Sequence, residues 1–190
     1  GILNEIQGMP NEHGHQNPHS SSAAQQLSTS VDQPIFVPNE HAFIPGTPLY
    51  EAFAECYAKQ EKFDLVLCFH GTAASNIRPI LQNGLDSQKR GTACGQKLGP
   101  GEYFARKLPV ALHYSRRCPG GTSPASNQVI LFAVLTRTGD ITTFSNDAWG
   151  QIVICPEPRR ALPLGVVTVT NRPDEIVQQW LLRGERQKAK

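Results

Sequence analysis

The feature that most constrains this chain is a short apolar run, Leu65 to Phe69, which leads directly into His70-Gly71-Thr72. Apolar residues at consecutive positions predict a strand that is buried on both faces, and a run of this length is far too short to span a membrane. Further runs rich in Val, Ile and Leu predict strands at about 128–136, 150–155 and 164–170. Because these three late strands follow helical segments, we expect an α+β fold.

Helices are expected where apolar residues recur every three or four positions. The expected helices cover about 48–59 after Thr47-Pro48, a short stretch around Ile77 to Leu81, about 108–115, and a segment opening at Asp174 and Glu175. Pro79 should make the start of the short helix late or irregular, and Gly84 should close it. Pro109 is acceptable because it falls in the first turn of its helix.

Residues 1–45 differ from the remainder, since they are rich in Asn, Gln, Ser and Pro. We interpret them as a polar linker or a peripheral wrap, and 46–190 as the folded domain, excised from a longer protein. His13, His15 and His19 lack acidic or cysteine neighbours, so no metal site is expected. The net charge of +2 points to neither nucleic acid nor a membrane as partner.

The chain has five cysteines, an odd number without paired spacing, so neither a disulfide framework nor a zinc finger is expected. Cys68 and Cys155 lie inside apolar runs, where a free thiol behaves as a small buried hydrophobic group. Free thiols are typical of reducing compartments, so we expect an intracellular protein, cytoplasmic or nuclear.

An ordered set of motifs follows the first buried strand. The set is His70-Gly71-Thr72, then Asn83-Gly84-Leu85, then Gly99-Pro100-Gly101-Glu102-Tyr103-Phe104-Ala105, and finally Tyr114 nine residues later. In this order the motifs resemble the poly(ADP-ribose) polymerase family of diphtheria-toxin-like ADP-ribosyltransferases, over about residues 63–170. The resemblance implies two packed antiparallel sheets with flanking helices, around a cleft that binds NAD+ as co-substrate, with 46–190 as the catalytic domain.

The resemblance also implies roles in binding NAD+. Gly71 would hold the nicotinamide carboxamide through its backbone N–H and C=O, because it has no Cβ to obstruct the approach. Tyr103 and Tyr114 would flank the nicotinamide ring, where stacking combines with a cation–π attraction. His70 would hydrogen-bond the ribose hydroxyls, and Thr72 would lie on the adenosine side.

The implied reaction breaks the bond between nicotinamide and ribose, and a protein acceptor, which can be the enzyme itself, captures ADP-ribose. Polymer-forming members place a Glu at the start of the last core strand, a position that we align with Leu164. Leucine offers no general base, so His70, Tyr103 and Leu164 predict the mono-ADP-ribosylating branch. Glu157 is the rival match for that Glu, but it lies between two prolines.

Ala111 departs from the family pattern, which has a serine there that bonds the carboxamide. One lost hydrogen bond costs about 0.5–1.5 kcal/mol, so a catalytically weak or inactive NAD+ or ADP-ribose-binding module of the same fold stays open. An enzyme similar to tRNA 2′-phosphotransferases is a third reading, although it should be more basic than this chain. The adenosine-side groups in 87–98 are not assigned, and Lys89 or Arg90 is placed near a phosphate.

Overall fold

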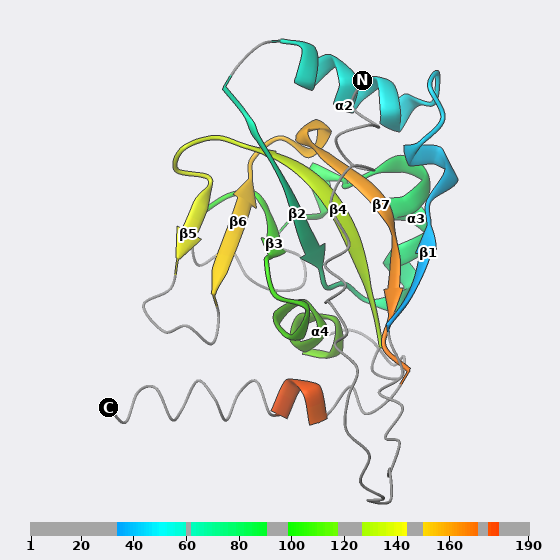
Figure 1. Cartoon of the computed structure of the whole chain (residues 1–190), viewed down its shortest axis with the longest axis vertical. Coiled ribbons are helices and arrows are strands. Elements are labelled where there is room, and N and C mark those ends of the chain that lie inside the picture. Colours follow the sequence, from blue (N-terminus) through cyan, green and yellow to red (C-terminus); the bar gives the residue numbers. More distant parts are fainter. Residues whose placement is uncertain are drawn as a thin grey trace, which may run out of the picture. The chain divides into compact units, whose positions relative to one another are not determined.

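The computed structural model describes residues 34–59, 62–90, 99–117, 127–143, 150–170 and 175–178 (Figure 1). These residues all belong to one compact unit, Gln33–Lys190. The labelled helices are α2 (Pro48–Ala58), α3 (Ala74–Asn83) and α4 (Leu108–Arg117), with the 3₁₀ turns η1 (Glu40–Ala42), η2 (Ser87–Lys89) and η3 (Pro158–Arg160). Residues 175–178 are also helical. The strands are β1 (Ile35–Pro38), β2 (Asp64–His70), β3 (Glu102–Ala105), β4 (Gln128–Thr136), β5 (Ile141–Thr143), β6 (Gln151–Cys155) and β7 (Ala161–Thr168).

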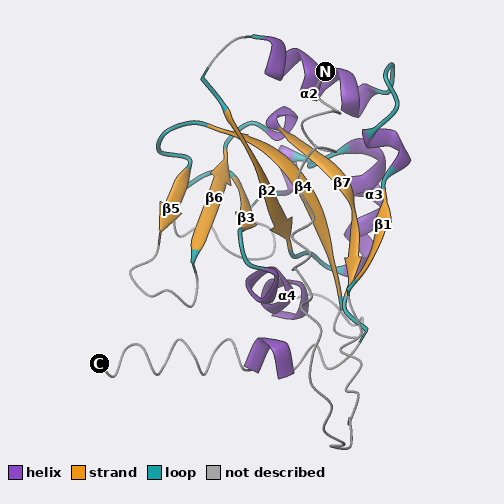
Figure 2. Ribbon diagram, viewed as in Figure 1, coloured by secondary structure: helices purple, strands orange, loops and turns teal. Residues whose placement is uncertain are grey.

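The described strands form a seven-stranded sheet in the order β1-β7-β4-β2-β3-β6-β5 (Figure 2). Every neighbouring pair is antiparallel. Between β2 and β3 the register holds a single pair, Phe69 and Ala105, whereas β2 and β4 pair from Asp64 to His70. The sheet therefore has a four-stranded and a three-stranded part that meet at one point, which confirms the predicted α+β fold with two antiparallel sheet parts.

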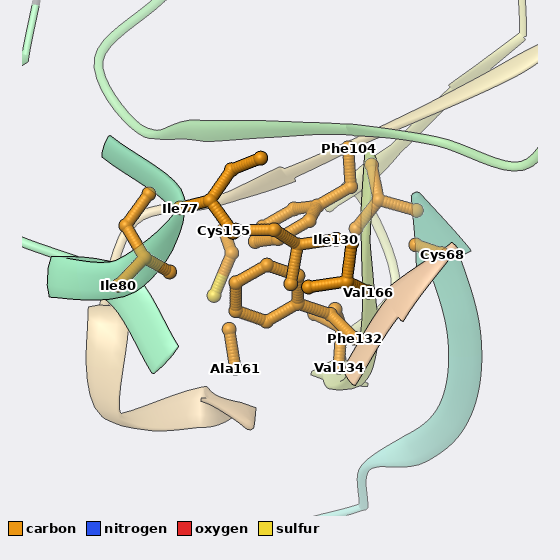
Figure 3. Packing of buried hydrophobic residues seen from close by; sticks show 11 residues of the cluster. Cys68, Ile77, Ile80, Phe104, Ile130, Phe132, Val134, Cys155, Ala161 and Val166 are labelled. Carbon is orange, nitrogen blue, oxygen red and sulfur yellow. The ribbon is translucent and has the colours of Figure 1, made fainter. Parts of the chain in front are cut away.

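Strand β4 lies at the centre of the core, and its residues alternate between two faces. Ile130, Phe132 and Val134 pack with Ile77 and Ile80 of α3, in the cluster that Figure 3 shows. Val129 instead packs with residues of α4, among them Val110 and Leu112. Because successive side chains of a strand point to opposite faces, α3 and α4 cover opposite sides of the sheet.

The helices begin and end largely where their capping residues predict. The Thr47 side chain accepts a hydrogen bond from the Tyr50 N–H at 3.4 Å, and Pro48 opens α2. Helix α3 ends at Gly84, which has φ 79°, but the expected late start is wrong, because α3 begins at Ala74 and contains Pro79. The carbonyl of Ser75, which Pro79 cannot bond, belongs to an exposed residue, so water can satisfy it.

Strand β7 begins at Ala161, three residues before its predicted start. Arg160 anchors that start, since its Nε donates to the carbonyl of Leu135 at 3.0 Å and its guanidinium pairs with Asp140. Pro163 lies inside β7, next to a register shift opposite Leu131 and Phe132. An irregularity of this kind tolerates a proline that has no N–H for the ladder, so Pro163 does not mark the strand boundary.

Strands β1, β3 and β5 are absent from the sequence-based prediction. All residues of β1 are exposed, and it is held as a strand by pairing with β7 from Ile35 to Pro38. Residues 35–38 fall within the segment interpreted as a linker or peripheral wrap. The three histidines of that segment, His13, His15 and His19, lie outside the described residues, as do Cys94 and Cys118.

Cys56, Cys68 and Cys155 are free and buried. Burial is the main cause that raises the pKa of Cys68 to about 12 and that of Cys155 to about 11, so both thiols stay protonated. Among the described residues, no helix combines the length and the apolar character that crossing a membrane requires.

Candidate active site

His70, the last residue of β2, is fixed by a contact with β3. Its Nδ1 lies 2.9 Å from the backbone carbonyl oxygen of Tyr103. A carbonyl oxygen only accepts hydrogen bonds, so Nδ1 must carry the proton. In the neutral ring Nε2 then has a free lone pair, which makes it an acceptor for a hydroxyl group.

The surroundings of His70 keep its imidazole neutral. The ring lies 5.6 Å from Phe104 and 6.0 Å from Phe132, measured between ring centroids. Burial lowers the pKa of His70 below its ordinary value, although the bond to Tyr103 and the charge of Glu102 oppose this. A neutral ring with Nδ1 protonated can accept from a ribose hydroxyl through Nε2, the role that the sequence predicts.

Gly71 lies against the backbone of α4. A Cβ at this position would be 1.9 Å from the carbonyl oxygen of Ala111 and 2.8 Å from the backbone nitrogen of Ser115. No side chain fits into that space, so glycine is required for the end of β2 to approach α4. The structure thus brings Gly71 and Ala111 together, as the resemblance implies, and Ala111 is only 1% exposed.

The two predicted tyrosines come from different elements. Tyr103 lies in β3, where its hydroxyl donates to the carbonyl of Gly99 at 2.6 Å. Tyr114 lies in α4, immediately before the Ser115 that adjoins Gly71, and is 37% exposed. Its ring meets that of His113 edge-on, with 5.8 Å between centroids. Tyr103 reaches His70 through its backbone, and Tyr114 reaches the same strand end through α4.

Thr72 is buried, and its hydroxyl oxygen accepts a hydrogen bond from Nδ2 of Asn76 at 3.1 Å. This contact joins the loop after β2 to the first turn of α3. It gives Thr72 a structural partner, and its position on the adenosine side stays a prediction.

Leu164 lies in β7, which β4 separates from β2, the strand of His70. It is the fourth residue of β7, so its predicted place at the start of the strand is wrong. Its side chain is 2% exposed, and its carbonyl accepts the N–H of Asn39 at 2.8 Å. The β4–β7 register passes from Pro163 to Gly165 across the shift, which leaves Leu164 as the extra residue.

Glu157, the rival position, lies beside α2. One of its carboxylate oxygens is 4.0 Å from Sγ of Cys56 in α2, and its carbonyl accepts from Sγ of Cys155 at 3.1 Å. In Figure 1, α2 and α4 lie at opposite ends of the sheet, and His70 leads to the α4 end. The structure therefore gives Glu157 a place beside α2 rather than at the candidate site.

Two residues near Tyr103 have roles that the sequence analysis missed. Arg90, one of the two residues placed there near a phosphate, binds Glu102 and the carbonyl of Pro156, each at 2.7 Å. The local sequence pattern does not predict this pair, because Arg90 and Glu102 are separated in the sequence. Pro156 comes close to them only because β3 pairs with β6. In the described part of the chain, no group of histidine, cysteine and acidic side chains has the arrangement of a metal site.

The antiparallel sheet in two parts, with histidine and tyrosine meeting where the parts join, defines the class of ADP-ribosyltransferase folds. A family model for the poly(ADP-ribose) polymerase (PARP) catalytic domain matches residues 47–152. This is more than half of the chain, so the chain belongs to the PARP family. The match includes every predicted site residue except Leu164. A search of curated proteins finds no match to this chain.

Proposed function

We propose that this domain is a mono-ADP-ribosyltransferase that transfers ADP-ribose from NAD+ to a protein acceptor and releases nicotinamide. Membership of the PARP family supports NAD+-dependent ADP-ribosyl transfer in general. The observation that carries the proposal to this chain is the contact between Nδ1 of His70 and the carbonyl of Tyr103, because it prepares Nε2 to accept from a ribose hydroxyl. Gly71, Tyr103 and Tyr114 hold the nicotinamide end in this proposal.

The reaction needs a leaving group, a cationic sugar and a nucleophile. The electrons of the bond between the anomeric carbon and nicotinamide stay with the nicotinamide nitrogen, which leaves as a neutral base. The anomeric carbon passes through an oxocarbenium-like state, and a carboxylate oxygen of the acceptor forms the new bond. The ionised acceptor brings its own nucleophilic electron pair, so the chain has to position NAD+ and need not deprotonate the acceptor.

Transfer of a single unit is favoured because Leu164 is aligned with the Glu of polymer-forming members and because the described strands β6 and β7 contain no acidic residue. The first residues of β6 and β7 are Gln151 and Ala161, and neither is acidic. Glu157 lies beside Cys56 of α2. Chain extension requires activation of a ribose hydroxyl, for which a carboxylate is the group that polymer-forming members use.

A second candidate function, a catalytically weak or inactive NAD+ or ADP-ribose-binding module of the same fold, is favoured by Ala111. This residue lies against Gly71 and has no hydroxyl for the carboxamide. The missing hydrogen bond corresponds to about tenfold weaker binding of nicotinamide, which reduces activity without abolishing it.

Incubation with labelled NAD+ separates the two functions. Label that is covalently attached to the protein supports the transferase, and its removal by neutral hydroxylamine indicates ester-linked acidic acceptors. His70→Ala should abolish the label, whereas Glu157→Gln, a carboxylate variant on the α2 side, should retain it. Binding of NAD+ without attached label would support the binding module, and abolition by Glu157→Gln in a folded protein would return that residue to the site.

We further propose an intracellular location, cytoplasmic or nuclear. The buried free thiols of Cys56, Cys68 and Cys155 support it, because unpaired cysteines are typical of reducing compartments.

A further inference from the structure

An ion pair joins Arg90 to the residue that precedes Tyr103. Arg90 follows η2, and its Nε donates to Oε1 of Glu102 at 2.7 Å. The side chains are 18% and 12% exposed, so solvent screens this pair less than a pair on the open surface. Nη2 of Arg90 also donates to the carbonyl of Pro156 at 2.7 Å. One guanidinium therefore holds both β3 and the residue that follows β6.

These contacts act on the strand pairing beside Tyr103. Glu102 pairs with Cys155, which directly precedes Pro156, and the next pair is Tyr103 with Ile154. Arg90 thus fastens β3 and β6 together at the end of their ladder, one residue from Tyr103. Adjacent side chains in a strand point to opposite faces, so Arg90 holds Glu102 on the face away from the Tyr103 ring.

The carbonyl of Tyr103 depends on this support because β3 is weakly joined to β2. Within the described strands, the register between β2 and β3 holds the pair Phe69 and Ala105 alone. The contact between Nδ1 of His70 and the Tyr103 carbonyl measures 2.9 Å. A displacement of β3 by about 1 Å would lengthen it beyond a useful hydrogen bond.

We propose that Arg90 and Glu102 form a positioning pair that holds the Tyr103 carbonyl on Nδ1 of His70 and so keeps Nε2 available to the ribose of NAD+. The inference rests on the proposed function for the identity of the substrate. Arg90 acts through Glu102 and Pro156 and touches no reacting atom, so it is a positioning residue.

The test measures the proton position on the His70 ring directly and measures the reaction with NAD+ separately. Nitrogen-15 spectra of the imidazole rings report which ring nitrogen carries the proton, and the spectrum of His70→Gln assigns the signals of His70. The variants are Arg90→Ala, Arg90→Lys and Glu102→Gln. The matched control is Arg159→Ala, which removes an exposed ion pair with Glu55 between η3 and α2. The kcat and KM for NAD+ are measured on the same proteins.

The wild type and Arg159→Ala should show His70 with its proton on Nδ1 alone. Arg90→Ala should show a mixture of the two neutral forms, and its kcat/KM for NAD+ should fall by about tenfold or more, because reacting groups tolerate little misplacement. Glu102→Gln keeps an acceptor for Nε of Arg90, so its kcat/KM for NAD+ should fall by less than that of Arg90→Ala. Should Arg90→Ala fail to fold, Arg90→Lys and Glu102→Gln carry the test, since each weakens the pair without removing either side chain.

An unchanged proton position and unchanged kinetics in the folded Arg90 and Glu102 variants would overturn the inference. A wild type that does not use NAD+, with a proton position that still responds to Arg90→Ala, would refute the proposed function and leave the positioning pair standing. A wild type that uses NAD+, with a proton position on His70 that does not respond to Arg90→Ala, would support the proposed function and refute the positioning pair.

Discussion

The backbone of Gly71 lies so close to Ala111 that a Cβ on Gly71 would be 1.9 Å from the Ala111 carbonyl oxygen. The clash is with backbone atoms of a helix, which cannot move aside as a side chain can. Packing of α4 therefore fixes both the residue type at 71 and the position of α4 relative to His70.

Gly71→Ala should lower the free energy of unfolding by about 2 kcal/mol or more, because α4 must be displaced from the end of β2. Urea unfolding followed by circular dichroism measures this. Ala74→Gly, at the exposed first position of α3, is the control and should cost about 1 kcal/mol or less. Equal and small losses for both variants would contradict the close approach of Gly71 to α4.

Ala111→Ser should strengthen binding of nicotinamide or a nicotinamide-like inhibitor by no more than about tenfold, because it restores one hydroxyl beside Gly71. Titration calorimetry on wild type and variant gives the two dissociation constants. A matched Ala54→Ser in α2 should leave them unchanged. Unchanged or weaker binding in Ala111→Ser, in a protein of normal stability, would mean that this face of α4 does not meet the carboxamide.

Leu164→Ala should destabilise the fold by about 2–5 kcal/mol and leave the KM for NAD+ unchanged, because Leu164 is a buried side chain of β7. Leu162→Ala removes an equally buried leucine from the same strand and serves as the control. A rise in KM that occurs with Leu164→Ala and not with Leu162→Ala would place Leu164 in the binding site after all.

The fold was predictable where the signals are local. The apolar run of β2 and the Thr47-Pro48 start of α2 both depend on residues adjacent in sequence, and the structure has both elements. Strand β1 exists through its pairing with β7, and β3 through its pairing with β6, so neither has a sufficient signal of its own. The displaced start of β7 has the same origin, because the register shift that admits Pro163 depends on β4.

The candidate site was predictable to a similar degree. The approach of Gly71 to Ala111 is what the family resemblance implied. The proton position of His70 was not predictable, since it follows from a carbonyl in another strand, and neither was the Arg90–Glu102 pair. The position of Leu164 at the start of β7 was predicted wrongly, because that strand boundary was inferred from a proline.

Acid should destabilise the wild type more than His70→Gln. Burial lowers the pKa of His70 from its ordinary 6.5, so below that pH the unfolded chain binds a proton that the folded chain resists. The contribution of His70 to stability is thus complete above pH 6.5 and is lost as the pH falls toward the folded-state pKa. Thermal unfolding of both proteins across this range measures the two acid-induced losses of stability, and a loss in the wild type no larger than that in His70→Gln would contradict the neutral imidazole.

The most direct test of the central claim is the structure of the product attached to the protein after reaction with NAD+. Cleavage of the pyrophosphate bond of a single attached ADP-ribose releases AMP, whereas the interior units of a polymer release AMP that carries an additional phosphoribosyl group. We predict AMP alone, in the wild type and in Glu157→Gln, identified by mass spectrometry of the released nucleotides. Phosphoribosyl-AMP from the wild type would contradict transfer of single units, and the absence of any released nucleotide would contradict ADP-ribosyl transfer itself.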